Sequence, residues 1–323
     1  MSEETKIVID SHEQLLLSLP KTNGWLGDIY LYQGFWCPSK ILTNIISLQK
    51  HYQAHDQHIL LASTPKSGLT WLKALVFSIT NRVTYTLSAT PLLTSNPHEL
   101  VPFLEFTLYA HNKIPEINST SDISLSPRLF STHIPYVSLP ESVKHSNCRV
   151  IYICRNPFDS LVSFWHFATG EGRLKYTMEE YAEKFCEGEV GFGPFWDHIL
   201  GFWKESLEKP EKVLFLKYEN LKEDPVFHVK KLAEFVGFPF SLEEEKQGVV
   251  EEIIKLCSLK NLKELEVNKN GKFMPNFRNK SYFRKGEVGD WVNHLSPSMV
   301  ERLKKVMQEK LSNSGLTFKA VLC

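Results

Sequence analysis

The chain has 323 residues, and its 37 Lys and Arg residues are balanced by 37 Asp and Glu, so its formal net charge at pH 7 is zero. A balanced charge argues against a general nucleic-acid binder. The length suits one large α/β domain or two small ones.

Neither a membrane segment nor a disulfide framework is expected. No apolar run reaches the roughly 18 residues that a membrane-spanning helix needs, and the acidic, polar start MSEETKIVID is unlike a signal peptide. We therefore expect a cytoplasmic protein with reduced thiols and without a membrane or nucleic-acid partner. The cysteines form no CxxC pair and no metal-ligand spacing; they are Cys37, Cys148, Cys154, Cys186, Cys257 and Cys323.

In chain order, a short helical pattern (12–19) and an aromatic stretch (24–38) precede an alternation of apolar strands and helices. Buried strands are predicted within HILLAST (58–64), CRVIYICRNP (148–157) and EKVLFLKYENL (211–221). Helices are predicted at 70–82, 157–170, 225–238, 242–266 with a break, and 296–311 with Ser296 as the N-cap. The remaining segments predict a turn and short helix (95–106), a loop closing on a strand (118–135) and a basic loop (271–294).

Apolar strands that alternate with helices predict a parallel sheet covered on both faces. Ligands of such sheets lie beyond the carboxyl ends of the strands. Lys66, Arg155 and Tyr218 follow three of the predicted strands and fall at this edge.

The stretch LLASTPKSGLTWLKAL, which begins at Leu60, predicts a strand, a tight loop with a lysine, and a helix. This order is typical of phosphate binding at a helix N-terminus. The spacing is not that of a nucleotide hydrolase, because Leu60 stands where the first Walker glycine would be. The strand before Arg155 ends in a cation where a magnesium-binding aspartate is expected. The pattern therefore favours an anion that side chains and a helix N-terminus neutralise, without a metal.

Part of this stretch, PKSGLTW (65–71), is followed in a specific order by CRNPFDSLVSFWHF (154–167) and RKGEVGDW (284–291), with RLFSTHIP and FGPFWDHILGFW between them. In these motifs the chain resembles the cytosolic sulfotransferases that use 3′-phosphoadenosine 5′-phosphosulfate (PAPS), most closely the plant branch. The resemblance covers roughly residues 20–320. It implies one P-loop-like α/β domain over 1–323, with a central parallel sheet flanked by helices, a core at about 58–320, and an N-terminal segment (1–57) that contributes to the acceptor pocket.

The resemblance also implies the donor site. Lys66 would stabilise the leaving phosphate at the bridging oxygen of PAPS. The 5′-phosphate would be held by Ser67, Gly68, Leu69, Thr70 and Trp71. The 3′-phosphate would be held by Arg155, Ser163, Arg284, Lys285 and Gly286. The adenine would contact Tyr218, Cys257 and Leu259.

His133, in STHIP, matches the general base of the family, and an imidazole that is mostly neutral at cytosolic pH suits that role. The acceptor would be a small hydrophobic molecule with a hydroxyl, such as a flavonoid, a steroid, a hydroxyjasmonate or a desulfoglucosinolate. Aromatic walls suit such molecules; the candidates are Phe35, Trp36, Phe103, Phe106, Trp165 and Phe167.

Two other functions are kept as alternatives. A P-loop kinase or NTPase would require Mg²⁺. A nucleotide-binding protein without catalysis is suggested by Leu69, Ser131 and Leu259, which depart from the usual residues of the family. The dimer motif of many animal relatives is absent, so we expect a monomer or a weak homodimer.

Overall fold

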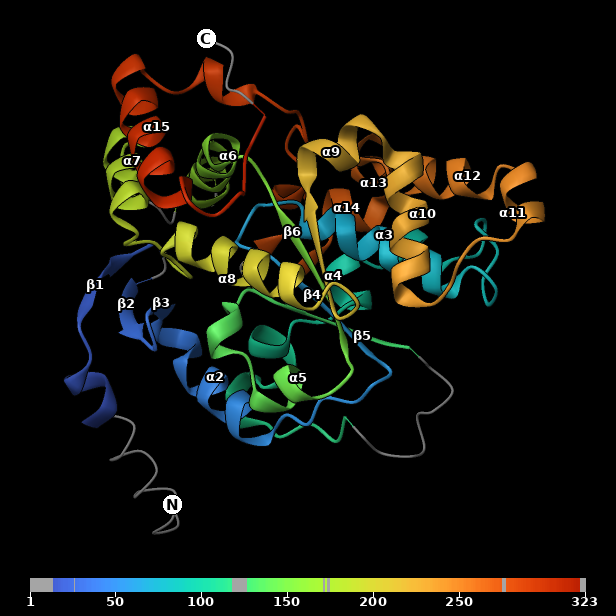
Figure 1. The fold of residues 1–323 in the computed structure, drawn as a ribbon, viewed down its shortest axis with the longest axis horizontal. Helices are drawn as coiled ribbons and strands as arrows, with labels where there is room; N and C mark the ends of the chain where they lie inside the picture. The colour runs from blue at the N-terminus through green and yellow to red at the C-terminus, as the bar shows by residue number, and fades with distance from the viewer. Residues whose placement is uncertain are drawn as a thin grey trace.

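The computed structural model describes residues 14–25, 27–117, 127–170, 172, 175–274 and 277–319. At its centre lies a parallel four-stranded sheet with the order β5-β4-β6-β7, as Figure 1 shows. This arrangement confirms the α/β fold with a central parallel sheet. Its strands are β4 (His58–Ala62), β5 (Arg128–Thr132), β6 (Arg149–Cys154) and β7 (Val213–Lys217).

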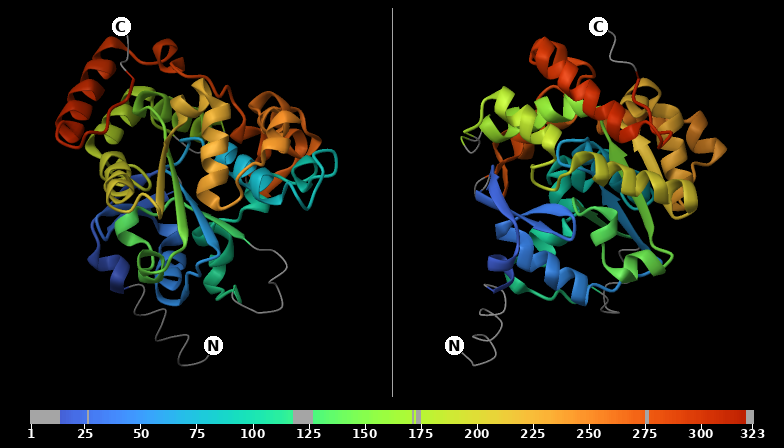
Figure 2. Two further views of the ribbon diagram at one scale, coloured as in Figure 1. Left: turned by 45° about the vertical axis from the view of Figure 1, so that its right-hand side comes forward. Right: turned by 60° about the vertical axis from the view of Figure 1, so that its left-hand side comes forward.

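Helices cover both faces of the sheet, which explains why its strands are apolar throughout (Figures 1 and 2). Alternate residues of a strand point to opposite faces. Leu60 and Ala62 belong to the hydrophobic cluster on one face, whose helices include α2 (Ser39–His51), α6 (Pro157–Gly170) and α8 (Phe195–Glu208). Ile59 and Leu61 belong to the other cluster, whose helices include α3 (Leu69–Asn81), α10 (Pro225–Val236) and α12 (Val249–Leu256).

The helix predicted over 242–266 is broken twice, at Gly248 and at Ser258, which gives α11, α12 and α13. Ser296 caps the last helix as predicted, because its side chain accepts a hydrogen bond from the backbone N–H of Met299. Residues 14–18 are also helical. Further α-helices are α4 (Pro97–Leu100), α5 (Glu141–His145), α7 (Met178–Glu187), α9 (Tyr218–Glu223), α11 (Leu242–Lys246), α13 (Leu259–Glu264), α14 (Glu266–Asn270) and α15 (Pro297–Leu311). A π-helix spans Leu104–Leu108, and 3₁₀ turns span Pro91–Leu93, Ala110–Asn112, Tyr136–Ser138, Asn279–Tyr282 and Asp290–Asn293.

Two small antiparallel sheets were not predicted. The aromatic stretch near the N-terminus forms a three-stranded sheet to the left of the main one in Figure 1. Its last two strands are joined by Gln33 and Gly34, which both have positive φ (49° and 83°), as a tight two-residue hairpin requires. The segment 271–294, expected to be a loop, contains a short hairpin. These strands are β1 (Lys21–Gly24), β2 (Gly27–Tyr32) and β3 (Phe35–Pro38), then β8 (Lys272–Met274) and β9 (Phe277–Arg278). Residues 118–126 of the other predicted loop lie outside the described residues.

The order of the strands shows where a ligand is expected. The connection from β4 leads to β5 on one side, and the connection from β6 leads to β7 on the other, while β4 and β6 are neighbours. A crevice therefore opens at the carboxyl ends of β4 and β6. The loop with Lys66 follows β4, and Arg155 follows β6 directly. Within the described ranges, no helix is long and apolar enough to cross a membrane.

Candidate active site

The loop after β4 is held in a fixed shape by its own side chains and by a glycine. The hydroxyls of Thr64 and Ser67 lie 2.6 Å apart and hydrogen-bond within the loop. Lys66 has a left-handed backbone (φ 67°). Gly68 (φ 106°) immediately precedes α3, and a Cβ there would lie 2.7 Å from Cδ2 of Tyr218. The loop thus requires glycine at this position, and the free amides at the start of α3 lie at the crevice.

One cavity of about 530 Å³ lies at this edge of the sheet. It is lined by all but one of the predicted donor-site residues, together with the predicted base and three of the predicted acceptor-site aromatics. These residues are Lys66, Gly68, Leu69, Thr70, Trp71, Phe103, Phe106, His133, Arg155, Ser163, Phe167, Tyr218, Cys257, Leu259, Arg284, Lys285 and Gly286.

Four predicted site residues do not line the cavity. Ser67 is fully buried within its loop. Phe35 is also buried, and its ring stacks 6.5 Å from that of Phe192. The backbone of Trp36 pairs with that of Phe192 and Gly193, and Trp165 Nε1 donates to the carbonyl of Tyr176. Phe35, Trp36 and Trp165, which were expected in the acceptor wall, therefore do not line this cavity.

Sequence reasoning missed other lining residues. Phe192 lies within FGPFWDHILGFW, and Tyr282 lies just before RKGEVGDW, so both were close to quoted motifs. From the segment 1–57, Trp25 of the aromatic stretch lines the cavity, together with Lys40, Ile41 and Asn44, which belong to no motif recognised in the sequence. The missed residues include Trp25, Lys40, Ile41, Asn44, His98, His111, Phe164, Phe192, Phe273, Phe277 and Tyr282.

Lys66 lies between the aromatic and the cationic parts of the cavity. Its Nζ is 4.2 Å from the ring centroid of Phe167 and 5.7 Å from that of Tyr282. Burial, together with the positive charges of Arg155 and Arg284, lowers the pKa of Lys66 to about 7. An anion in the cavity would remove this penalty, because it would stabilise the charged ammonium.

His133 is held so that one ring nitrogen faces away from its anchor. Nδ1 lies 2.7 Å from the carbonyl oxygen of Ser63, which can only accept, so Nδ1 carries the proton and Nε2 is the basic nitrogen. The backbone N–H of His133 donates to Oε1 of Glu105 at 2.7 Å. The ring packs 5.0 Å from Phe103 and 5.4 Å from Phe192. Burial lowers the pKa of His133 to about 3, which keeps the imidazole neutral.

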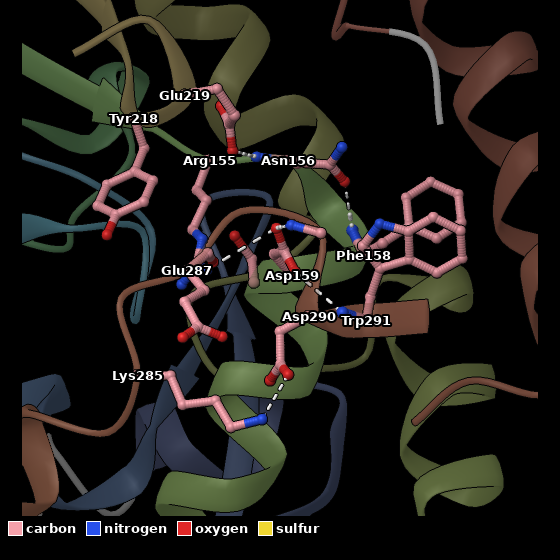
Figure 3. A network of polar contacts seen from close by, with 12 residues as sticks. Arg155, Asn156, Phe158, Asp159, Tyr218, Glu219, Lys285, Glu287, Asp290 and Trp291 are labelled. Carbon is pink, nitrogen blue, oxygen red and sulfur yellow. Dashed lines mark hydrogen bonds and ion pairs between the residues drawn. The ribbon is translucent and has the colours of Figure 1, made fainter. Parts of the chain in front are cut away.

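Arg155 also lines the cavity and belongs to the network of polar contacts in Figure 3. One of its terminal nitrogens donates to the carbonyl of Glu287 and lies 3.8 Å from Asp159. Its guanidinium lies over the ring of Tyr218, whose hydroxyl donates to the carbonyl of Gly286 at 2.8 Å. The side chain of Arg155 is buried, and Nε has no hydrogen-bond partner among the described residues.

Two buried aspartates hold the segment 284–291 in place (Figure 3). Asp159, on α6, accepts the backbone N–H groups of Gly289 (2.8 Å) and Trp291 (3.1 Å). Asp290 pairs with Arg284 at 2.7 Å and with Lys285 at 2.6 Å. Burial alone would raise the pKa of Asp290, but the two cations outweigh it and hold that pKa well below its usual range. Asp290 is thus a permanent carboxylate that fixes both cations at the rim.

Comparison with known proteins identifies the family. The sequence profile of the sulfotransferase domain matches residues 56–315. The chain belongs to the sulfotransferase family. It is 48% identical over 326 residues to cytosolic sulfotransferase 15 of Arabidopsis thaliana, covering 98% of this chain and 90% of the relative. It is 50% identical over 317 residues to cytosolic sulfotransferase 14 of the same plant, covering 95% and 90%.

Solved structures of sulfotransferases share the fold. A sulphotransferase of Arabidopsis thaliana superposes with a TM-score of 0.75 at 42% identity, over 95% of this chain and 94% of the other. A mouse sulfotransferase complexed with PAP, the product nucleotide, superposes with a TM-score of 0.66 at 26% identity, over 88% and 94%. The chain is therefore a PAPS-dependent sulfotransferase of the plant cytosolic type, and the kinase, NTPase and non-catalytic alternatives are set aside. The expected cytosolic location agrees with the names of these relatives.

The cavity of this sulfotransferase suits a polyanionic nucleotide. Arg155 Nε and Arg284 Nε are both buried and lack a hydrogen-bond partner among the described residues. Lys66 is half-buried, and within the described part of the chain its Nζ donates only to the carbonyl of Ser281 and pairs with no carboxylate. Buried donors of this kind are costly unless a ligand accepts from them. Within the described part of the chain, no three His, Cys, Asp or Glu side chains gather in a way that could hold a metal ion.

Proposed function

We propose that this sulfotransferase moves the sulfuryl group of PAPS to a hydroxyl of a small hydrophobic acceptor, with His133 as the general base and Lys66 stabilising the leaving phosphate. The observation that carries the proposal is the position of these two residues. Lys66 contacts Phe167 and is close enough to Arg155 and Arg284 to feel their charge, while His133 packs among Phe103, Phe106 and Phe192. Both therefore lie where the cationic and the aromatic walls of one cavity meet.

The aromatic wall supports a flat or polycyclic acceptor. Rings of Phe103 and Phe106 lie 5.3 Å apart, and those of Phe106 and Phe192 lie 5.9 Å apart. On the other flank, Phe167 stacks on Phe277 at 5.8 Å, and Trp25 lies 5.8 Å from Phe167. Aromatic walls with few polar groups suit the acceptors expected from the sequence, namely flavonoids, steroids, hydroxyjasmonates and similar hydroxylated molecules.

In the proposed mechanism His133 and Lys66 have separate roles: His133 accepts the proton of the acceptor hydroxyl, and Lys66 stabilises the leaving phosphate. The acceptor oxygen attacks sulfur in line with the bond to the 5′-phosphate, and His133 Nε2 takes the hydroxyl proton. The bond between sulfur and the bridging oxygen breaks, and the electron pair stays on the phosphate, where the Lys66 ammonium offsets the new charge. By analogy with phosphoryl transfer, positioning and electrostatics dominate such a step. No metal ion is required, and we propose that the enzyme works as a monomer or a weak homodimer.

The function is tested by transfer of radiolabelled sulfate from PAPS to a panel of flavonoids, steroids, hydroxyjasmonates and desulfoglucosinolates, in buffer with EDTA. We expect a labelled, hydrophobic product with at least one of these classes, and an unchanged rate when Mg²⁺ replaces EDTA. Absence of transfer to every class would contradict the proposed acceptor chemistry. A strict requirement for Mg²⁺ would contradict the charge-neutralising roles given to Lys66 and the arginines.

A second expected result concerns the choice of donor. Arg155, Ser163 and the turn of Arg284, Lys285 and Gly286 line the same cavity, and we propose that they hold the 3′-phosphate. A dianion would be held there by charge-assisted hydrogen bonds, each contributing roughly 1.5–3 kcal/mol. Arg155→Ala should therefore lower the affinity for adenosine 3′,5′-bisphosphate (PAP) by at least about tenfold. It should barely change the affinity for AMP, which lacks the 3′-phosphate.

The measurement is isothermal titration of PAP and AMP into wild type and variants. Arg149→Ala is the matched control, because Arg149 begins the same strand at its other end and donates to the carbonyl of Val236. It removes the same charge and should leave the preference for PAP intact. Equal binding of PAP and AMP by wild type would contradict the 3′-phosphate site and the PAPS assignment of these residues.

A further inference from the structure

A lysine with no assigned role is buried next to the site. Lys73 lies on α3, one turn after Thr70, and its side chain is fully excluded from solvent. Its Nζ lies 2.8 Å from Nδ1 of His98 and 3.5 Å from the ring centroid of Phe103. Lysine is almost never fully buried without a partner, so this contact with His98 calls for an explanation.

His98 continues the contact towards the cavity. Its other ring nitrogen, Nε2, lies 3.0 Å from the hydroxyl oxygen of Thr70, which lines the cavity at the start of α3. The imidazole is buried, and three rings fix its plane, with centroids at 4.4 Å (Tyr282), 5.3 Å (Phe103) and 5.3 Å (Phe273). Lys73, His98 and Thr70 thus form one buried chain of polar atoms that ends at the phosphate loop.

The backbone around His98 is also anchored. Asn96 caps α4 by accepting the N–H of His98 at 2.9 Å, and its side-chain amide donates to Asn268 on α14 at 2.8 Å. The position of the imidazole is therefore set independently of Lys73 and Thr70. In a fixed neutral imidazole, a group that donates to one ring nitrogen forces the proton onto the other nitrogen, which must then donate to its own partner.

The direction follows from the donors that each group carries. Lysine has N–H donors in either charge state, and an ammonium can only donate. When Lys73 donates to Nδ1, His98 must carry its proton on Nε2 and donate to Thr70. The Thr70 oxygen is then an acceptor, so its own O–H is free to point into the cavity. In the reverse direction, Thr70 would donate to His98 and would have no proton left for an anion.

We propose that Lys73 and His98 are positioning residues that orient the Thr70 hydroxyl outward, as a hydrogen-bond donor to the 5′-phosphate of the donor nucleotide. This inference rests on the proposed function. The pKa of Lys73 lies well below its usual range, because the effect of burial is larger than the opposing effect of the nearby Glu105 charge. An anion at Thr70 favours the same donor direction, because the N–H and O–H dipoles of Lys73, His98 and Thr70 then all point towards the anion.

The test compares PAP with adenosine 3′-phosphate, which lacks the 5′-phosphate, by isothermal titration into the full chain. Thr70→Val should lower the affinity for PAP by at least about tenfold, which corresponds to the loss of one hydrogen bond to a charged group. The affinity for adenosine 3′-phosphate should not change. His98→Leu should weaken PAP by a similar factor, again without affecting the second nucleotide. Because both changes remove the same hydrogen bond, the double variant should bind PAP no more weakly than Thr70→Val alone.

Three further variants separate this role from a structural one. His98→Gln keeps an N–H donor near the position of Nε2 and should recover part of the lost PAP affinity. Lys73→Met keeps the volume of the side chain and should weaken PAP selectively without lowering the melting temperature, since an apolar group replaces a buried polar one. Thr80→Val removes a hydroxyl from the same helix, where it donates to the carbonyl of Val76, and should leave both affinities unchanged.

The outcomes are distinguishable. The positioning role is wrong if His98→Leu lowers the affinity for both nucleotides by the same factor. It is also wrong if His98→Leu lowers the affinity for PAP as much in the Thr70→Val variant as in wild type. In either case the proposed function stands. If wild type binds PAP and adenosine 3′-phosphate with equal affinity, the 5′-phosphate does not lie at Thr70, and the donor site assigned under the proposed function fails as well.

Discussion

Replacement of His133 by alanine is expected to lower the rate of sulfuryl transfer to an aliphatic alcohol by roughly 10²–10⁴-fold, the usual contribution of a general base. The loss should be much smaller for an acidic phenol. An aliphatic hydroxyl needs a base to lose its proton, whereas an acidic phenol already forms the anion in water. Since Nδ1 of His133 donates to the carbonyl of Ser63, Nε2 is the basic nitrogen that is lost when alanine replaces the imidazole.

The measurement is kcat for two acceptors of similar size and different acidity, in wild type and His133→Ala. His111→Ala serves as the control, because His111 also lines the cavity but is exposed, and no hydrogen bond anchors its ring within the described ranges. That variant should change the two rates by the same factor, if at all. A His133→Ala variant that slows both acceptors equally would contradict the base assignment and leave His133 as a packing residue.

Lys66→Ala is expected to lower kcat by roughly 10²–10³-fold, as the loss of one preorganised donor to a developing charge does, and to weaken PAP far less. In the proposed mechanism the ammonium matters most in the transition state, when the bridging oxygen gains charge. Titration of PAP and steady-state rates with a saturating acceptor measure the two effects separately. Lys230→Ala, which removes a surface ion pair with Glu245, should alter neither. Equal losses in kcat and in PAP affinity would show that Lys66 only binds.

The same lysine predicts a pH dependence of donor binding. In the free enzyme the pKa of Lys66 is about 7, below its usual value of 10.5, because of burial and of Arg155 and Arg284. Bound phosphates favour the charged form, so binding takes up a proton above pH 7 and the affinity for PAP falls as the pH rises from 7 to 9. Below pH 7 Lys66 is already charged, and its contribution levels off. Lys66→Ala should lose this slope, and a slope that persists in the variant would exclude Lys66 as its source.

The sequence predicted the parts of the structure that depend on local patterns. Short apolar runs between helical patterns located β4, β6 and β7, and the motif order located the cationic wall of the cavity. Parallel strands end at one edge, so the sequence alone predicts that Lys66, Arg155 and Tyr218 lie close together. The tight turn at Gln33 and Gly34 could also have been predicted, since glycine in a two-residue loop between aromatic runs is typical of a hairpin.

Other parts depend on tertiary packing and left no local signal. Phe35 and Phe192 belong to segments far apart in the chain, and only their stacking decides that Phe192 lines the cavity while Phe35 supports it from behind. Lys73 sits in a helix where a charged residue suggests a solvent-exposed face, yet it is fully buried because His98 lies beside it in space. An apolar wall built from several elements cannot be assigned from residue type alone, because core and pocket use the same side chains.

The pairing of Arg284 and Lys285 with the buried Asp290 has a consequence for the ionic-strength dependence of this enzyme. A cationic rim normally attracts small anions from solution. A polyanionic ligand displaces these ions when it binds, and their release contributes favourably to the entropy of binding. Here the neutralising carboxylate belongs to the protein and is already paired with both cations before any ligand binds. If the nucleotide binds at this rim as proposed, we expect the rim to release fewer small ions than its cations would suggest, and donor binding to be less sensitive to salt than the number of positive side chains implies.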